Sequence, residues 1–225
     1  MGIRTIQFGD DEFYHIYNRG VDKRIIFNDN SDRQRFVNLL YLANSKQSID
    51  YREIKSKNQS IFDYEIEDKI ISIGAYCLMP NHFHILVRAK EGVNVNKFMN
   101  KLCTGYSMYF NKKNDRSGAL FQGRFKAKYA DSDEYLKYLF SYIHLNPLHI
   151  DKDPTTKDRP SDNLSVLDLY HAKEYQWSSL LDYYGVNRQE LKILDIDEFP
   201  AYFSSSKALD KELLDWINFS VENNP

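Results

Sequence analysis

Cysteine and long apolar runs are both scarce in this sequence. Its 225 residues include only two cysteines, Cys77 and Cys103, and their separation matches no metal-ligand spacing. A chain of this length can bury enough apolar surface to fold without disulfide bonds, which favours a reducing, cytoplasmic environment. Residues 1–7 lack the apolar core of a signal peptide, and the most apolar stretch, Ile70 to Met79, is too short to span a bilayer. We therefore expect a cytoplasmic protein with no membrane partner.

The net charge of −2 conceals an uneven distribution. Residues 1–150 carry 22 basic and 17 acidic side chains (net +5), whereas residues 151–225 carry 8 and 15 (net −7). A basic segment in an otherwise balanced chain is typical of phosphate contact, although a solvated helix face has the same composition. Residues 101–128, with a net charge of +6, contain these basic residues: Lys101, Lys112, Lys113, Arg116, Arg124, Lys126 and Lys128.

Hydrophobic patterning predicts seven main elements in the order β-α-β-β-α-β-α. Strands are expected at 13–18, 69–79, 82–88 and 120–130, and helices at 31–43, 94–111 and 131–146. Two βαβ-like halves indicate an α+β fold, a ferredoxin-like antiparallel sheet with helices on one face. A polar insertion is expected at about 44–68 within a domain of residues 1–150. Residues 151–225 are expected to form an acidic, mostly helical C-terminal extension with an amphipathic stretch at Leu209 to Ile217.

His82 and His84 form the first candidate site. Side chains alternate along a strand, so both imidazoles point to one face and Phe83 to the other. Two imidazoles on one face can chelate a divalent ion, and the preceding Pro80-Asn81 turn places them near a loop, where functional residues concentrate. A pair of buried, hydrogen-bonded histidines is the alternative that spacing alone leaves open.

Tyr142 and Asn146 form the second candidate site. Their i, i+4 spacing puts them on one face of the last predicted helix. Pro147 biases the chain to leave the helix after Asn146, so the oxygen of this residue could reach a metal at the helix end. Spacing alone favours a packed core position for Tyr142, because an aromatic residue on a helix is usually buried.

Five segments of the chain carry an ordered set of motifs: Tyr14 to Gly20, Met79 to Val87, Phe121 to Lys126, Tyr142 to Pro147 and Trp177 to Ser179. In this order they resemble the opening strand, the two-histidine motif, the basic strand, the tyrosine motif and a downstream signature of the REP-associated tyrosine transposases. That family is a branch of the HUH single-strand transposases. The resemblance covers about residues 10–185, and the last forty or so residues match no motif.

The resemblance implies a mechanism for the candidate residues. His82 and His84 would hold Mg²⁺ or Mn²⁺, with Asn146 as a third ligand where related insertion-sequence transposases have Gln. Two imidazoles suit Mn²⁺, while Mg²⁺ prefers oxygen and would need water and phosphate ligands. Tyr142 would attack the phosphorus and leave a 5′-phosphotyrosine link and a free 3′-OH. A tyrosine has an ordinary pKa of about 10, so the site must activate it.

The resemblance also implies a DNA partner. The expected substrate is single-stranded DNA folded into hairpins, the REP-like palindromes, with short adjoining guide sequences. Contacts to the DNA backbone are expected from the basic residues Lys112, Lys113, Arg116, Arg124, Lys126 and Lys128. Both a monomer and a homodimer that exchanges the tyrosine helix are compatible with the family.

Two alternative functions remain open from the sequence. The first is a non-catalytic protein of the same fold that binds hairpin nucleic acids. The second is a metal phosphodiesterase in which water, rather than Tyr142, attacks the phosphorus. The His-x-His pair and the tyrosine with its following Asn146 are intact, which favours the transposase reading over the other two.

Overall fold

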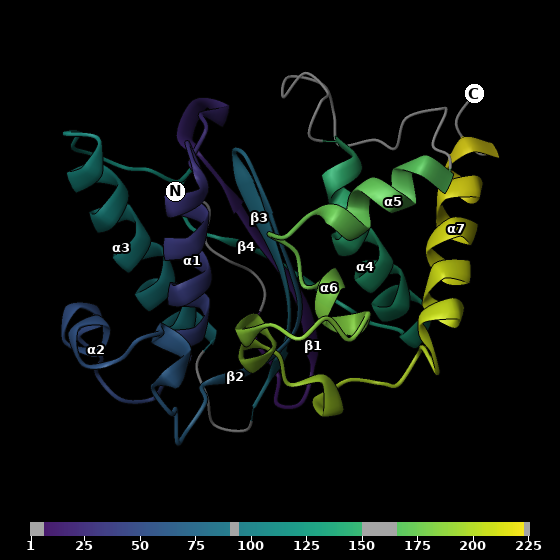
Figure 1. The fold of residues 1–225 in the computed structure, drawn as a ribbon, viewed down its shortest axis with the longest axis horizontal. Coiled ribbons are helices and arrows are strands. Elements are labelled where there is room, and N and C mark those ends of the chain that lie inside the picture. Colours follow the sequence, from purple (N-terminus) through teal and green to yellow (C-terminus); the bar gives the residue numbers. More distant parts are fainter. Residues whose placement is uncertain (1–6, 91–94, 150–165, 223–225) are drawn as a thin grey trace.

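A four-stranded antiparallel sheet forms the centre of the protein (Figure 1). The computed structural model describes residues 7–90, 95–149 and 166–222. Outside these ranges lie residues 1–6, the first residue of the helix expected at 94–111 and the start of the acidic extension. The sheet order is β2-β3-β1-β4, and every pairing is antiparallel. The four strands are β1 (Phe13–Arg19), β2 (Ile71–Met79), β3 (His82–Ala89) and β4 (Lys126–Tyr129). This order confirms the predicted ferredoxin-like α+β fold, but the helices lie on both faces of the sheet and not on one, because residues 133–145 and the C-terminal extension form a second apolar cluster on the other face.

Two helices cover the first face of the sheet, α1 (Asn30–Leu42) and α3 (Val95–Lys113). Alternation along the strands sends Ile16, Phe83 and Ile85 to this face, where each is fully buried. Apolar residues of α1 and α3 recur at helical spacing and pack against them in one cluster. Asp29 caps α1 by accepting a hydrogen bond from the Asp32 amide at 3.0 Å.

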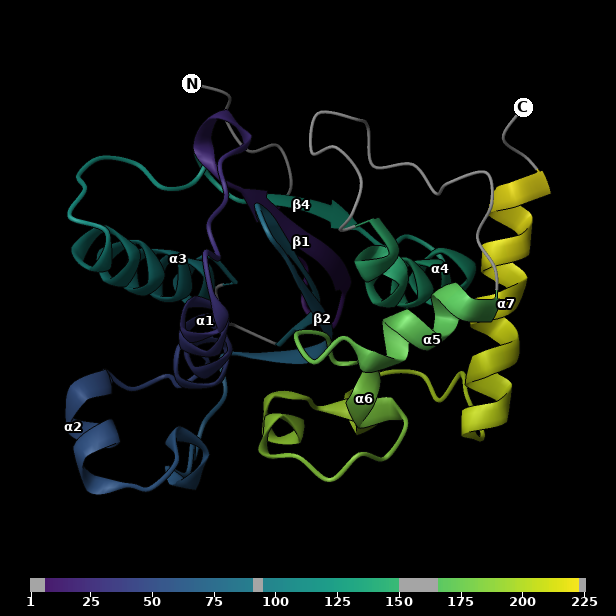
Figure 2. The ribbon, with the colours of Figure 1, turned by 45° about the horizontal axis from the view of Figure 1, so that its top comes forward.

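The second face is covered by α4 (Asp133–Leu145) and the C-terminal helices (Figure 2). Ala75 and Leu86 of the sheet, Ile143 of α4 and Leu213 of α7 are buried in one apolar cluster. The C-terminal helices are α5 (Val166–Glu174), α6 (Leu180–Tyr183) and α7 (Ser206–Glu222). The predicted mostly helical extension is confirmed, and its amphipathic stretch is α7, which buries Leu209, Leu213 and Ile217.

The segment after α5 covers the outer edge of β2. The Leu78 amide donates to the Trp177 carbonyl at 3.0 Å, and the Ser179 amide donates to the Tyr76 carbonyl, also at 3.0 Å. The Tyr76 amide donates in turn to the Ser179 hydroxyl at 2.9 Å. These bonds satisfy backbone groups that an exposed edge strand would offer to another chain. Trp177 to Ser179, the last of the recognised motifs, thus lies along the edge of β2, with Ser178 opposite Cys77 in an isolated antiparallel bridge.

One of the remaining segments departs from its predicted boundaries. The insertion expected at 44–68 contains α2 (Tyr51–Lys57), which Asp50 caps through the Arg52 and Glu53 amides. The strand expected at 120–130 is paired regularly only as β4, because Gly123 has a φ of 74° and turns the chain out of extended geometry. Short 3₁₀ segments lie at Val21–Lys23, Ile61–Asp63, Asn146–His149, Gln189–Ile193 and Ile196–Glu198. No helix in the described ranges is long and apolar enough to cross a bilayer.

Candidate active site

The two predicted histidines lie together at the start of β3. The Pro80-Asn81 turn ends β2, and alternation along β3 then sends His82 and His84 to the second face and Phe83 into the core of the first. The two imidazole rings are perpendicular, with centroids 4.9 Å apart. His84 is buried and His82 is partly exposed, so the pair lies at the rim of the sheet face.

Tyr142 lies directly against this pair. Apolar residues of α4 at helical spacing, among them Leu139 and Ile143, pack on the second face of the sheet and set the position of the helix. The Tyr142 ring is then perpendicular to the His84 ring, with centroids 5.5 Å apart. Tyr142 is only partly buried, whereas its neighbour Ile143 is fully buried. The histidine pair and Tyr142 are more than fifty residues apart in the sequence and lie next to each other in the fold.

Asn146 lies at the end of α4, as its spacing predicts. Its side-chain amide nitrogen donates to the Tyr142 carbonyl at 2.7 Å, and the residue is buried. This bond closes the last turn of the tyrosine helix and uses the nitrogen, so the amide oxygen is the atom that could bind a cation. His144, between the two, is fully buried with its Nε2 2.7 Å from the Ser179 hydroxyl.

A third histidine, His15, joins the site and was missed by the sequence reasoning. Its Nε2 lies 2.8 Å from Nδ1 of His84, and the ring is buried on β1. Tyr17, two residues on, stacks on His15 with ring centroids 5.0 Å apart. The signal in the sequence is a pair of polar rings at alternating positions of an otherwise apolar strand. Its meaning depends on the pairing of β1 with β3, which the sequence alone does not show.

The buried rings of His84 and His15 are uncharged at neutral pH. Burial lowers the pKa of His84 well below its usual value, and the adjacent His82 and His15 lower it further. Burial and the nearby Lys128 ammonium lower the pKa of His15 to about 3. Neutral imidazole is the form that binds metal ions, so no proton has to leave these two rings before a cation binds.

The donor atoms fit a divalent cation. Nε2 of His84 is buried and has no hydrogen-bond partner among the described residues, which is unusual for a buried polar atom. Two imidazoles suit Mn²⁺ better than Mg²⁺, which prefers oxygen ligands. Within the described ranges no three His, Cys, Asp or Glu side chains form a complete ligand set. The protein therefore offers a partial coordination shell that water or a phosphate oxygen would complete.

Two of the predicted basic residues lie beside the site. β4 pairs with β1 so that Lys126 is opposite Tyr17 and Lys128 is opposite His15, on the same sheet face. Both lysines are exposed; the Lys126 ammonium is 6.0 Å from the Tyr17 ring centre and that of Lys128 is 4.5 Å from the Tyr135 ring centre. Arg124 is exposed just before β4. This combination of cations and aromatic faces is suited to a nucleic-acid strand.

The other predicted basic residues lie at the end of α3, on the first-face side of the sheet. Lys113 binds the carboxylates of Asp29 and Asp32 at 2.8 and 2.6 Å, and Asp32 is fully buried. Arg116 donates to the Ala119 carbonyl at 3.1 Å and also to the side chain of Asn111. Lys112 is exposed. The fold thus separates Lys112, Lys113 and Arg116 from the histidine pair.

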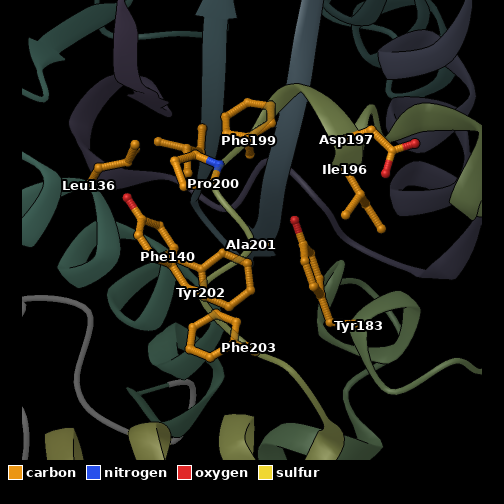
Figure 3. Close-up of a pocket in the computed structure, with 11 residues that line it drawn as sticks. Leu136, Phe140, Tyr183, Ile196, Asp197, Phe199, Pro200, Ala201, Tyr202 and Phe203 are labelled. Carbon is orange, nitrogen blue, oxygen red and sulfur yellow. The ribbon is translucent and has the colours of Figure 1, made fainter.

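A cavity of about 260 Å³ lies between α4 and the C-terminal extension. Figure 3 shows Leu136 and Phe140 of α4 among the residues that line it, together with Phe199, Tyr202 and Phe203 of the extension. Its lining is mostly apolar and includes none of the histidines or basic residues described above. The cavity therefore shares no residue with the candidate site and lies between the extension and α4.

The chain has counterparts among known proteins. The chain belongs to the IS200-like transposase family, because the model of that family, described as "Transposase IS200 like", matches residues 31–146. The matched segment contains His82, His84, Tyr142 and Asn146, and leaves His15 outside. The predicted recognition is confirmed at the level of this family, and the protein is a transposase by descent. No curated protein matches the chain.

One solved structure shares the fold. A REP-associated tyrosine transposase, solved bound to a REP hairpin, aligns with a TM-score of 0.52 over 84% of this chain and 90% of its own, at 11% identity. A protein of Deinococcus radiodurans described as a transposase aligns with a TM-score of 0.34 over 64% of this chain and 95% of its own, at 14% identity. The first shares the fold, and the second alignment is too weak to carry an argument.

Proposed function

We propose that this protein is a single-strand DNA transposase that cleaves and rejoins hairpin-containing DNA through Tyr142. The observation that carries the proposal is the contact between the Tyr142 ring and His84 across two separate elements, at 5.5 Å. A tyrosine with only a structural role could be fully buried in the apolar cluster on this face. Tyr142 is instead only partly buried and lies at the rim of the sheet face beside neutral imidazoles. Membership of the IS200-like transposase family supports the same reaction class.

The chain's own residues would act as follows. The phenolic oxygen of Tyr142 would form a bond to phosphorus while the bond from phosphorus to the 3′ oxygen breaks. The proton that the phenol gives up would pass through water to that oxygen, which leaves as a 3′-OH. The product is a 5′-phosphotyrosine, which keeps the phosphodiester energy for rejoining. A divalent cation held by His82 and His84, with Asn146 as third ligand, would stabilise the negative charge on the phosphate. Asn146 also fixes the Tyr142 carbonyl and so the last turn of α4.

The DNA would lie along the second sheet face next to β4. Lys126 and Lys128 would bind phosphates near the scissile bond, and Arg124 would extend this contact past the end of the strand. Tyr17 and Tyr135, each beside one of the two lysines, offer ring faces on which unpaired bases can stack. The fold-level relative was solved with a REP hairpin, which supports a folded single strand as the substrate.

Replacement of the nucleophile gives the decisive experiment. Purified protein is mixed with Mn²⁺ and a single-stranded oligonucleotide carrying the imperfect palindromes that flank its own reading frame. The unsubstituted protein is expected to form a covalent adduct that survives SDS, and Tyr142→Phe to form none. Tyr138→Phe, one turn away and stacked on Tyr142 with centroids 5.8 Å apart, is the matched control and should retain the adduct.

The same experiment separates the two alternative functions. Hairpin binding without an adduct in any metal would identify a non-catalytic binding protein. Release of a free 5′-phosphate that continues in Tyr142→Phe would show that water attacks. An undiminished adduct in Tyr142→Phe would refute the assignment of the nucleophile.

A further inference from the structure

Both histidines of the candidate site use Nδ1 for an internal contact. Nδ1 of His82 lies 2.6 Å from the side-chain oxygen of Asn81. Nδ1 of His84 lies 2.8 Å from Nε2 of His15. Each imidazole has two nitrogens, so in both rings Nε2 remains as the atom that could bind a cation. The two contacts come from different elements, the β2–β3 turn and β1.

The contact with Asn81 sets the position of the proton on His82. The Asn81 amide nitrogen donates to the Lys23 carbonyl at 3.3 Å, which orients the amide oxygen toward the imidazole. An amide oxygen can only accept a hydrogen bond, so Nδ1 of His82 must carry the proton. The lone pair of the neutral ring then lies on Nε2.

The contact with His15 allows two arrangements of the proton on His84. If Nδ1 of His84 donates to His15, the lone pair of His84 lies on the buried Nε2, where a cation can bind. If His15 donates instead, Nε2 of His84 carries an N–H that has no acceptor among the described residues. A buried donor without an acceptor is destabilising, so the first arrangement is favoured. Binding of a cation at Nε2 of His84 would exclude the second arrangement and leave only the first.

The surroundings hold His15 in place for this contact. β1 pairs with β3 along its whole length, with Tyr17 opposite His84. Tyr17 stacks on the His15 ring, with an angle of 28° between the planes, and the His15 ring is nearly parallel to that of His84 at 23°. The ring of His15 thus packs against both Tyr17 and His84, with its Nε2 directed at Nδ1 of His84.

We propose that Asn81 and His15 are positioning residues that fix the two site histidines with protons on Nδ1 and aim both Nε2 lone pairs at the bound cation. This inference rests on the proposed function, since it assumes that the histidines are metal ligands. It assigns a role to His15, which lies outside the segment matched by the family model. Contacts to the far nitrogen of a ligating histidine typically change metal affinity about 10- to 100-fold.

The test compares Mn²⁺ affinity, measured from the electron paramagnetic resonance signal of free Mn²⁺, across two pairs of variants. His15→Leu removes the acceptor and is expected to weaken Mn²⁺ binding about 10- to 100-fold. His15→Gln keeps an acceptor at similar reach and should stay within a few-fold of the unsubstituted protein. Asn81→Leu and Asn81→Asp form the second pair, with loss expected only in the first. Circular dichroism and thermal unfolding verify that each variant is folded.

A second readout needs no variant and no metal. Nitrogen-15 shifts of the histidine rings in the metal-free protein should show protonated Nδ1 and unprotonated Nε2 in both His82 and His84. Equal affinity of the Leu and Gln variants at position 15, whether both normal or both weakened, would overturn the role of His15. Protons found on Nε2 of both rings would overturn the proposal as a whole. If the unsubstituted protein bound no Mn²⁺, the proposed function would fail, while the nitrogen shifts would still decide the protonation pattern.

Discussion

His144 shows at the scale of one residue how burial links this fold to pH. The ring is fully buried between α4 and the Trp177-Ser179 segment, and burial, with a smaller effect of Arg188, lowers its pKa to about 3. In the unfolded chain its pKa would be the ordinary 6.5. As pH falls below 6.5 the unfolded chain takes up a proton that the folded protein does not, so stability is complete above this pH and declines toward pH 3.

The size of this effect can be measured. Between pH 6 and 5 the buried His144 should lower the free energy of unfolding by about 1 kcal/mol per pH unit. Urea unfolding in EDTA at pH 7, 6 and 5 gives the slope, and His144→Gln should make it shallower by that amount. His171→Gln, a replacement on an exposed position of α5, is the control and should leave the slope unchanged. An unchanged slope in His144→Gln would mean that the ring is protonated in the folded state.

At the scale of single elements, β4 and the end of α3 divide the basic residues into two groups. On β4, Lys126 and Lys128 are exposed beside the site. At the end of α3, Lys113 is bound to Asp29 and to the fully buried Asp32. We therefore expect phosphate contact at β4, whereas Lys113 joins α3 to the start of α1.

Salt-dependent DNA binding distinguishes the two groups. Each of Lys126→Gln and Lys128→Gln should reduce the slope of log affinity against log salt for single-stranded DNA by about 0.7, since each removes one phosphate contact. Lys113→Gln should leave the salt slope unchanged and lower the free energy of unfolding by about 1 kcal/mol. This is at the low end of the cost of removing a partner from a buried acceptor, because Asn28 and Tyr109 also donate hydrogen bonds to Asp32. Lys55→Gln on the exposed side of α2 is the control for both measurements. Unchanged slopes for both β4 variants would place the DNA elsewhere.

Element type and order were predictable from local pattern, but the partners of individual residues were not. The alternation of His82, Phe83 and His84 and the i, i+4 spacing of Tyr142 and Asn146 are local, and the structure places these residues as those patterns predict. The bond between His15 and His84 joins residues 69 apart and depends on strand register. The ion pairs of Lys113 with Asp29 and Asp32 likewise depend on the packing of α3 against α1, which a count of charges along the sequence could not show.

At the scale of the whole molecule, the C-terminal extension holds the tyrosine helix on its own sheet. α4 is covered by α7 through an ion pair of Lys137 with Glu212 at 2.6 Å and a ring contact of Tyr138 with Trp216 at 4.8 Å. Figure 2 shows α7 lying along the outer side of α4 and α5. Exchange of α4 with a second copy would have to break this apolar and ionic contact. We therefore expect Tyr142 to work with the His82–His84 pair of the same chain.

Mixing two inactive variants tests this expectation. Tyr142→Phe keeps the histidines and His84→Ala keeps the tyrosine, so a dimer that exchanged α4 would rebuild one complete site in the mixture. Because α7 and α5 cover α4 within one chain, an equimolar mixture should form no more SDS-resistant adduct than the two variants separately. As a control, unsubstituted protein is mixed with an equal amount of either variant. Adduct formation by the unsubstituted protein in this mixture shows that the variants do not inhibit it. Adduct formation in the mixture would demonstrate exchange of α4. Such an exchange would require α7 to leave α4 and so break the Tyr138–Trp216 contact, a change that tryptophan fluorescence would detect.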